Sequence, residues 1–306
     1  MLYLNQPKQN VKAYFSTDRG APTLTNSNLG LIFQACLVEG FGDKEGAGWR
    51  TVLADAQENK YIFAPKRSSR NDENFFLQME IRNGAAHCQC RVDMDATPDS
   101  GQKRLELSTP YKYGKNLYGA DAWFLVASGR SVVFFTRTWP HGLTKERTGN
   151  FFAFGESTRS HRGEVAVFMA HSGGGYDDGA VASPFLYEPN WPDPGARGTC
   201  AQGYLPSVRP NAAQRIYFTS LFRYQFATDS NPRFGDTSER YLSPMLFDLG
   251  GDVFAVPGVF THSKDGDNMT IFRIDEERFV LAHALAWAGN NHAMSRLAVA
   301  CDKWSL

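Results

Sequence analysis

Apolar residues follow a helical period in one segment near the start of the chain. Between Asn28 and Val38 they recur at spacings of three and four positions, which lines one face of an α-helix. This stripe consists of Leu29, Ile32, Phe33, Cys36 and Leu37. The polar run 25–28 can supply an N-cap oxygen, and Gly40 can supply the left-handed residue that often ends a helix. The pattern therefore predicts a helix over 28–38.

Most of the remaining chain has the pattern of β-strands. Short runs rich in aromatic and β-branched residues are separated by turn-forming residues at the spacing of antiparallel sheets. The predicted strands are Tyr61–Phe63, Phe75–Arg82, Ala86–Asp93, Ala122–Ala127, Ser131–Thr138, Asn150–Phe154, Glu164–Ala170, Gln214–Phe226, Val253–Val256, Met269–Ile274 and Arg278–His283. Turns at 128–130 and around 275–277 predict two hairpins. We expect a mainly β fold with antiparallel sheets, arranged as a sandwich or a barrel, with one N-terminal helix and long loops.

Four segments carry Gly, Pro and Asp too densely for regular structure, and we expect them to be loops. They are 95–114, 171–182, 188–203 and 228–239. Long loops on a β core usually have functional or interface roles, and surface loops without a specific role are the alternative. We interpret residues 1–306 as one large β-rich unit, with 188–203 as the segment at which it would be subdivided.

The charge balance disfavours two classes of partner. Lys and Arg number 32, and so do Asp and Glu, so the formal net charge is zero. A protein that coats nucleic acid or binds anionic lipid usually carries a basic excess. Bases do outnumber acids between Arg130 and Arg162, with aromatic residues interleaved, which can suit single-stranded nucleic acid. A solvated sheet face or a protein interface is favoured, so we expect no nucleic-acid partner.

Cysteine usage and hydropathy indicate synthesis in a cytoplasm. The five cysteines are scattered and odd in number, which argues against a disulfide framework. The N-terminus lacks an apolar run behind a basic region, so no secretory signal is predicted. The longest uncharged stretch near the C-terminus, Phe279–Ser295, is interrupted by the polar run 289–292. We therefore expect no membrane segment.

Familiar catalytic signatures are absent from the chain. It contains no phosphate-binding loop, nucleophile elbow, zinc-protease helix motif or dinucleotide-binding glycine motif. His171–Gly175 resembles a glycine-rich oxyanion loop, but no nucleophile elbow follows, so a turn is the better interpretation. Asp177 and Asp178 would suit a cation or a carboxylate dyad, although exposed turn residues explain them more simply. We predict a protein that is not an enzyme and has no cofactor.

Two segments have some of the residues of a metal site. Asp265 begins a stretch like a calcium-binding loop, but Met269 and Thr270 stand where an oxygen ligand and a glycine are needed. Cys88 and Cys90 would share one face of a strand, while His87 would lie on the other. Buried structural cysteines are therefore favoured, and no metal is predicted.

The segment Leu29–Trp49 resembles a motif in a family of tailed-bacteriophage virion proteins. In that family Gly-Ala-Pro precedes an apolar helix with an Ala-Cys-Leu-Val core, followed by Gly-aromatic-Gly and then Gly-Trp. This chain has Arg19–Pro22, Gln34–Val38, Gly40–Gly42 and Gly48–Trp49 at these places. The run 122–135 resembles the family's Trp-rich phrase, Gly-Arg turn and aromatic strand. More faintly, 74–79 resembles an earlier strand, and Pro257-Gly258 with 269–283 resembles the end of the family pattern.

Two departures from the family pattern are visible. Gln34 stands where the family has an acidic residue, and 284–306 extend past the matched part. The resemblance implies a structural component of the virion in the tail, baseplate or neck, made in the host bacterial cytoplasm. Its partners would be copies of itself and other virion proteins. A capsid-surface decoration protein and a receptor- or glycan-binding tail module are two alternatives. The third, an enzyme such as a cell-wall hydrolase of the tail tip, would need a carboxylate pair or metal cluster that the sequence does not show, and the family offers no catalytic residues to transfer.

Two groups of residues follow from this interpretation. The fold motif consists of Phe33, Cys36, Gly40, Gly42, Gly48 and Trp49, in which a core helix leads through a tight glycine path to a large apolar anchor. The predicted interface residues are Tyr176, Tyr187, Trp191 and Arg197, which lie in two long loops. Aromatic and Arg side chains dominate protein interfaces, so we expect at least one of these loops to contact a neighbouring subunit.

Overall fold

The computed structural model describes the greater part of the chain. The described residues are 7–25, 28–66, 74–82, 85–92, 94, 101–108, 122–137, 149–174, 181–182, 201–207, 213–216, 218–219, 226–228, 242–262, 267–288 and 291–305. Their strands form three sheets, of five, fifteen and two strands. The predicted mainly β fold with one N-terminal helix is confirmed, and the described strands form no closed barrel.

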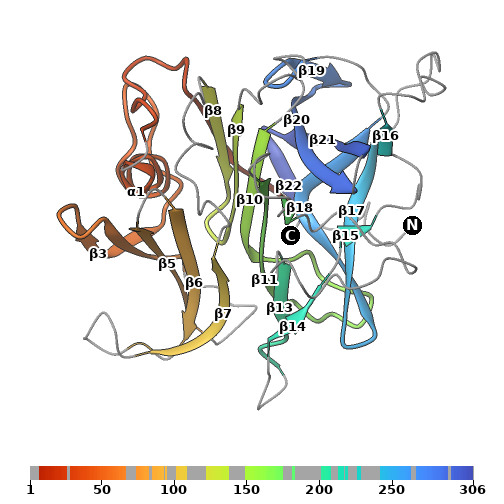
Figure 1. The fold of residues 1–306 in the computed structure, drawn as a ribbon, viewed down its shortest axis with the longest axis horizontal. Helices are drawn as coiled ribbons and strands as arrows, with labels where there is room; N and C mark the ends of the chain where they lie inside the picture. Colours follow the sequence, from red (N-terminus) through yellow and green to blue (C-terminus); the bar gives the residue numbers. More distant parts are fainter. Residues whose placement is uncertain are drawn as a thin grey trace.

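The five-stranded sheet is an antiparallel meander on one side of the molecule (Figure 1). Its strands are β3 (Arg50–Asp55), β4 (Lys60–Ala64), β5 (Phe75–Arg82), β6 (Ala85–Val92) and β7 (Gln102–Ser108). Each strand pairs with the next in the sequence. The two-stranded sheet joins the ends of the described chain, because β1 (Lys8–Asn10) pairs with β22 (Lys303–Ser305).

The large sheet has two halves joined by one parallel contact. The first half contains β2 (Lys12–Phe15), β8 (Ala122–Ala127), β9 (Ser131–Arg137), β10 (Gly149–Glu156), β11 (Val167–Gly174), β12 (Val181–Ala182), β13 (Ala201–Tyr204) and β14 (Gln214–Arg215). The second contains β15 (Phe218–Thr219), β16 (Phe226–Thr228), β17 (Leu242–Leu249), β18 (Asp252–His262), β19 (Ile271–Ile274), β20 (Glu277–Ala288) and β21 (Asn291–Ala300). Gly149 of β10 pairs with Ala284 of β20, and the sheet turns there to face itself.

The strands β8 to β11 form a middle layer that is buried on both faces. In β8, Phe124 and Val126 belong to the core shared with the second half of the large sheet. Trp123 and Leu125, one position away, belong to the core shared with the five-stranded sheet and the helix. The same alternation continues in β9, β10 and β11. Burial on both faces explains why these strands read as nearly continuous apolar runs.

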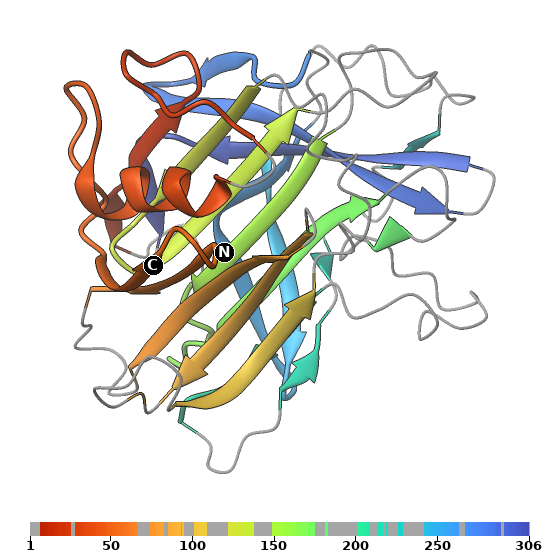
Figure 2. The same ribbon diagram turned by 60° about the vertical axis from the view of Figure 1, so that its left-hand side comes forward.

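The predicted helix is present, but its second half has π geometry. α1 (Leu29–Gln34) continues into a π-helix, η2 (Ala35–Glu39), and the whole predicted stripe is buried. Figure 2 shows the helix in front of β8 and β9, beside the five-stranded sheet. The helix ends at Gly40 as expected, although Gly40 has φ 83° and ψ 174°, which is a glycine-only extended conformation and not left-handed helix. No helix among the described residues is both long and apolar enough to span a membrane.

Both predicted hairpins are confirmed. β8 pairs with β9 around the turn 128–130, and β19 pairs with β20 through Ile274 and Glu277. The predicted bounds of β5 and β8 agree with the structure.

Several loop and strand predictions are wrong. Strand β7 lies in the predicted loop 95–114, because edge strands carry polar residues freely. Strand β11 extends to Gly174, so His171 lies in a strand and not in a loop, and its neighbouring glycines pair through backbone alone. Within the predicted strand Gln214–Phe226, the described residues form the short strands β14 and β15, residue 216 belongs to neither, and β16 begins at Phe226. β17 was missed because Pro244 disfavours a strand, and the structure has a register shift there.

Candidate functional site

Residues 28–49 form a compact unit, here called the helix–turn unit, in which the chain after the π-helix binds back to it. The N–H of Gly40 donates to the carbonyl of Ala35 at 2.7 Å, which is the wide spacing of a π-helix. The carbonyls of Cys36 and Leu37 accept hydrogen bonds from the N–H groups of Ala47 and Trp49, each at 3.0 Å. The end of the helix is therefore satisfied by the segment that follows it.

The glycines of the helix–turn unit stand where two backbones approach closely. Phe41 and Lys44 exchange backbone hydrogen bonds of 2.9 and 3.0 Å across a tight turn. Gly42, in that turn, has φ 61°, and a Cβ there would lie 2.3 Å from the carbonyl oxygen of Arg19. Gly48 has φ 89°, which disfavours any side chain. The backbone geometry thus favours glycine at positions 42 and 48.

Trp49 and Trp123 connect distant segments of the chain through their indole N–H groups. Trp49 is buried, with an exposed fraction of 4%, and its indole Nε1–H donates to the carbonyl of Ser128 at 2.8 Å. The indole of Trp123 donates to the carbonyl of Pro22 at 3.1 Å. Phe33 is fully buried and its ring packs edge-on against Phe134 at 5.2 Å. The predicted burial of Phe33, Cys36 and Trp49 is confirmed.

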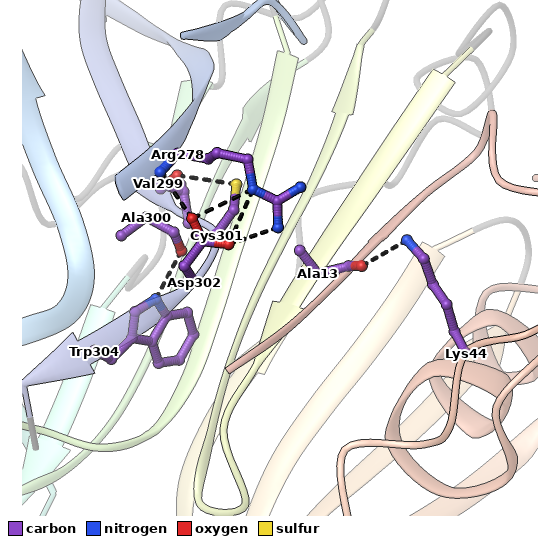
Figure 3. Close-up of polar contacts among 8 residues, drawn as sticks. All are labelled: Ala13, Lys44, Arg278, Val299, Ala300, Cys301, Asp302 and Trp304. Atoms are coloured by element: carbon purple, nitrogen blue, oxygen red, sulfur yellow. Dashed lines mark hydrogen bonds and ion pairs between the residues drawn. The ribbon is translucent and has the colours of Figure 1, made fainter. Parts of the chain in front are cut away.

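Lys44 fixes the helix–turn unit to the N-terminal strand, a role that no local sequence pattern indicates. Its Nζ donates to the carbonyl of Ala13 at 2.8 Å (Figure 3) and forms an ion pair with Asp18 at 2.5 Å. The ammonium also lies 5.9 Å from the ring centre of Tyr14 and 5.5 Å from that of Phe15. Burial raises the pKa of the Tyr14 hydroxyl, which donates to a backbone carbonyl.

A buried ion pair accounts for one of the bases in the stretch 130–162. The guanidinium of Arg130 lies 2.5 Å from the carboxylate of Glu156, and both side chains are buried. Arg130 also donates to the carbonyl of Lys66 at 2.6 Å and covers the ring of Phe75, with 4.6 Å between guanidinium carbon and ring centre. Arg130 is thus used to join strands, and it is not presented to a ligand.

The C-terminal residues are held by a second set of polar contacts (Figure 3). Arg278 Nη2 lies 2.5 Å from Asp302 Oδ1, and the N–H of Arg278 donates to Oδ2 at 2.8 Å. The hydrogen bonds from Arg278 lower the pKa of the Asp302 carboxyl. The indole of Trp304 donates to the carbonyl of Ala300 at 2.9 Å, and a Cβ at Gly258 would lie 1.9 Å from that indole nitrogen.

Cys88 and Cys90 pack in the core, as predicted from the strand alternation. Cys88 and Cys90 are buried in the core that also contains Cys36, while His87 is only partly buried. Burial raises the pKa of the Cys88 thiol to about 12, so the thiol form dominates at neutral pH. Within the described part of the chain, no three His, Cys, Asp or Glu side chains are grouped to hold a metal ion.

The four predicted interface residues, Tyr176, Tyr187, Trp191 and Arg197, lie outside the described residues, and so do Asp177 and Asp178. What the structure does bring together is the set of segments that carry the family resemblance, namely 19–22, 34–49 and 122–135. Searches among protein-family models, curated proteins and solved structures found no match to the chain.

Proposed function

We propose that the protein is a non-enzymatic structural component of a tailed-bacteriophage particle, located in the tail, baseplate or neck. It would act by assembling with copies of itself and with other virion proteins after synthesis in the host cytoplasm. The observation that supports this most is the convergence of the resembling segments. Trp49 reaches the turn at Ser128, and Trp123 reaches Pro22, so segments far apart in sequence form one packed unit.

This convergence adds weight to the sequence resemblance. Short matches that arise by chance have no reason to meet in space, whereas residues that jointly specify a fold must contact one another. The matched glycines and aromatics have structural roles here, which suits a family whose motif specifies a scaffold and not a reaction. The polar contacts of Lys44, Arg130 and Arg278 likewise tie distant segments together.

The test is to locate the protein in purified particles of the phage that encodes it. We expect mass spectrometry to detect the chain in the particles and immunogold labelling to mark the tail or neck. Labelling of the capsid surface would favour the decoration alternative, and absence from intact particles would overturn the proposal.

The predicted loop interface has its own test within the same system. Replacing 188–198 by a short Gly/Ser link should leave the isolated protein folded but block its incorporation into particles. The replacement removes loop aromatics such as Trp191, which we propose anchor the contact. Particles that assemble normally with the replaced loop would remove this segment from the interface.

A further inference from the structure

Residues 8–18, here called the N-terminal arm, cover the outer edge of β8. Strand β2 of the arm pairs with β8, and among the described strands β8 has only β9 as its other neighbour. Before β2, the N–H of Val11 donates to the carbonyl of Asp302 at 3.0 Å, and β1 pairs with β22. Figure 3 shows Ala13 of the arm between the C-terminal residues and Lys44. The arm therefore crosses from the C-terminal strand to the edge of the large sheet.

The arm has few side chains in the core. Tyr14 is the one fully buried side chain of β1 and β2, and the others are exposed or partly buried. Its remaining contacts include backbone pairing and two ion pairs at the surface, from Lys8 to Glu277 and from Lys12 to Glu45. Release of the arm would expose few large apolar side chains, so the arm belongs to the parts of the fold that open most easily.

The edge beneath the arm, in contrast, is unsuited to solvent. All six residues of β8, Ala122–Ala127, are buried. Without β2, a row of unpaired backbone N–H and C=O groups would lie beside these apolar side chains, and such an edge is a template for pairing with another strand. β2 itself fits this edge, because its register from Lys12 to Phe15 and the ring contact of Phe15 with Phe124 are already formed. The arm of a second copy carries the same residues and fits equally well.

A short turn decides which copy the arm covers. Asp18 closes this turn, because its carboxylate accepts the N–H of Phe15 at 2.6 Å and its own N–H donates to the Phe15 carbonyl at 3.0 Å. The chain is fixed to the body again at Pro22, whose carbonyl accepts the indole N–H of Trp123. Residues 16–21 therefore act as the hinge. Fully extended, they span about 20 Å, at about 3.3 Å per residue, which allows the arm to reach a neighbouring copy.

We propose that the N-terminal arm exchanges reciprocally between two copies of the chain, so that each arm pairs with β8 and β22 of the other copy. The exchanged dimer remakes the contacts of the closed chain and changes only the hinge, so it needs no new complementary surface. The closed arm competes at an effective concentration on the order of millimolar, so the wild type is mainly monomeric at micromolar concentration. This exchange is a property of the chain itself and does not depend on the proposed virion function.

Charge reversal on the two sides of the arm contacts can force the exchange. One variant carries Lys8→Glu and Lys12→Glu, and the other carries Glu45→Lys and Glu277→Lys. In either variant alone, like charges meet in the closed form and in the exchanged form. When the two variants combine, each arm meets opposite charges on the other copy, so only the exchanged mixed dimer restores both ion pairs at each arm.

Co-expression of the two full chains with different affinity tags tests this exchange. Purification on both tags in succession should recover a dimer of two 34.1 kDa chains. The yield should be at least about tenfold higher than when either variant is co-expressed with a differently tagged copy of itself. Hydrogen exchange followed by mass spectrometry should show the N–H groups of Val11 and Ser16 protected in the mixed dimer, because they bond to the carbonyls of Asp302 and Trp123.

Two controls separate arm exchange from misfolding and from general charge attraction. A chain that carries all four changes restores the ion pairs within one copy, so it should fold and remain mainly monomeric. Lys103→Glu co-expressed with Glu106→Lys is the matched control, because this ion pair lies within β7 and should yield no dimer. Absence of the mixed dimer, an equal yield from the β7 control, or a mixed dimer with an unprotected arm would each overturn the proposal.

Discussion

Replacing Trp49 by Ala tests the packing of the helix–turn unit most directly. A Trp side chain buries about 150–250 Å² of surface, which at about 25 cal/mol/Å² is worth about 4–6 kcal/mol. Trp-to-Ala substitutions in protein cores cost about 3–5 kcal/mol. The indole also donates to the buried carbonyl of Ser128 at 2.8 Å, and an unsatisfied buried acceptor costs about 1–3 kcal/mol. We therefore expect a loss of at least about 3 kcal/mol in the free energy of unfolding.

Urea unfolding followed by far-UV circular dichroism measures this loss as a shift in the transition midpoint. Trp49→Phe keeps most of the apolar contact and removes only the donor, so it should cost about 1–3 kcal/mol. Leu31→Ala on the same helix is the matched control, because Leu31 is 45% exposed and should change stability by less than about 0.5 kcal/mol. A Trp49→Ala variant with the wild-type midpoint would refute the conclusion that the buried Trp49 side chain stabilises the fold.

Three further outcomes follow from the structure. The four described cysteines should resist thiol reagents at pH 8 until the chain unfolds, as mapped by mass spectrometry, because burial disfavours the thiolate. Gly258→Ala should cost about 2 kcal/mol more than Gly163→Ala in urea unfolding, since both have positive φ but only the first meets Trp304. The Asp302 carboxyl has a pKa below its unfolded value, so its pairing with Arg278 stabilises the fold above about pH 4 and is lost as pH falls further. Asp302→Asn should therefore flatten the acid side of the stability profile.

The strands of the middle layer were predictable because burial on both faces leaves little room for polar residues. The run 122–127 and its partner 131–137 are nearly all apolar, and their short turn fixes the register between them. The helix was predictable for a related reason, since one face packs on a sheet and produces a clear stripe. A clear apolar pattern in the sequence thus arises where an element is buried on one face only or on all sides.

Elements that form only through contact with another segment left no such pattern. β7 is a polar edge strand, and β17 contains Pro244, so each is a strand only through pairing with a neighbour. The π-helix depends on donors at Ala47 and Trp49, and the role of Lys44 depends on the placement of Ala13. None of these contacts has a signature in local composition. The interface residues of the long loops stay a prediction, since they lie outside the described residues.

Two indole hydrogen bonds couple segments that lie far apart in the sequence. Trp49 needs a carbonyl from residue 128, 79 positions away, and Trp123 needs one from residue 22, 101 positions away. Each of these segments therefore forms part of the environment of the other, and the loss of one partner leaves an indole donor or a buried carbonyl unpaired. The strands between them require only alternating apolar side chains of suitable volume, which many sequences provide. The segments 29–49 and 122–135 are therefore more tightly constrained by each other than the strands between them are.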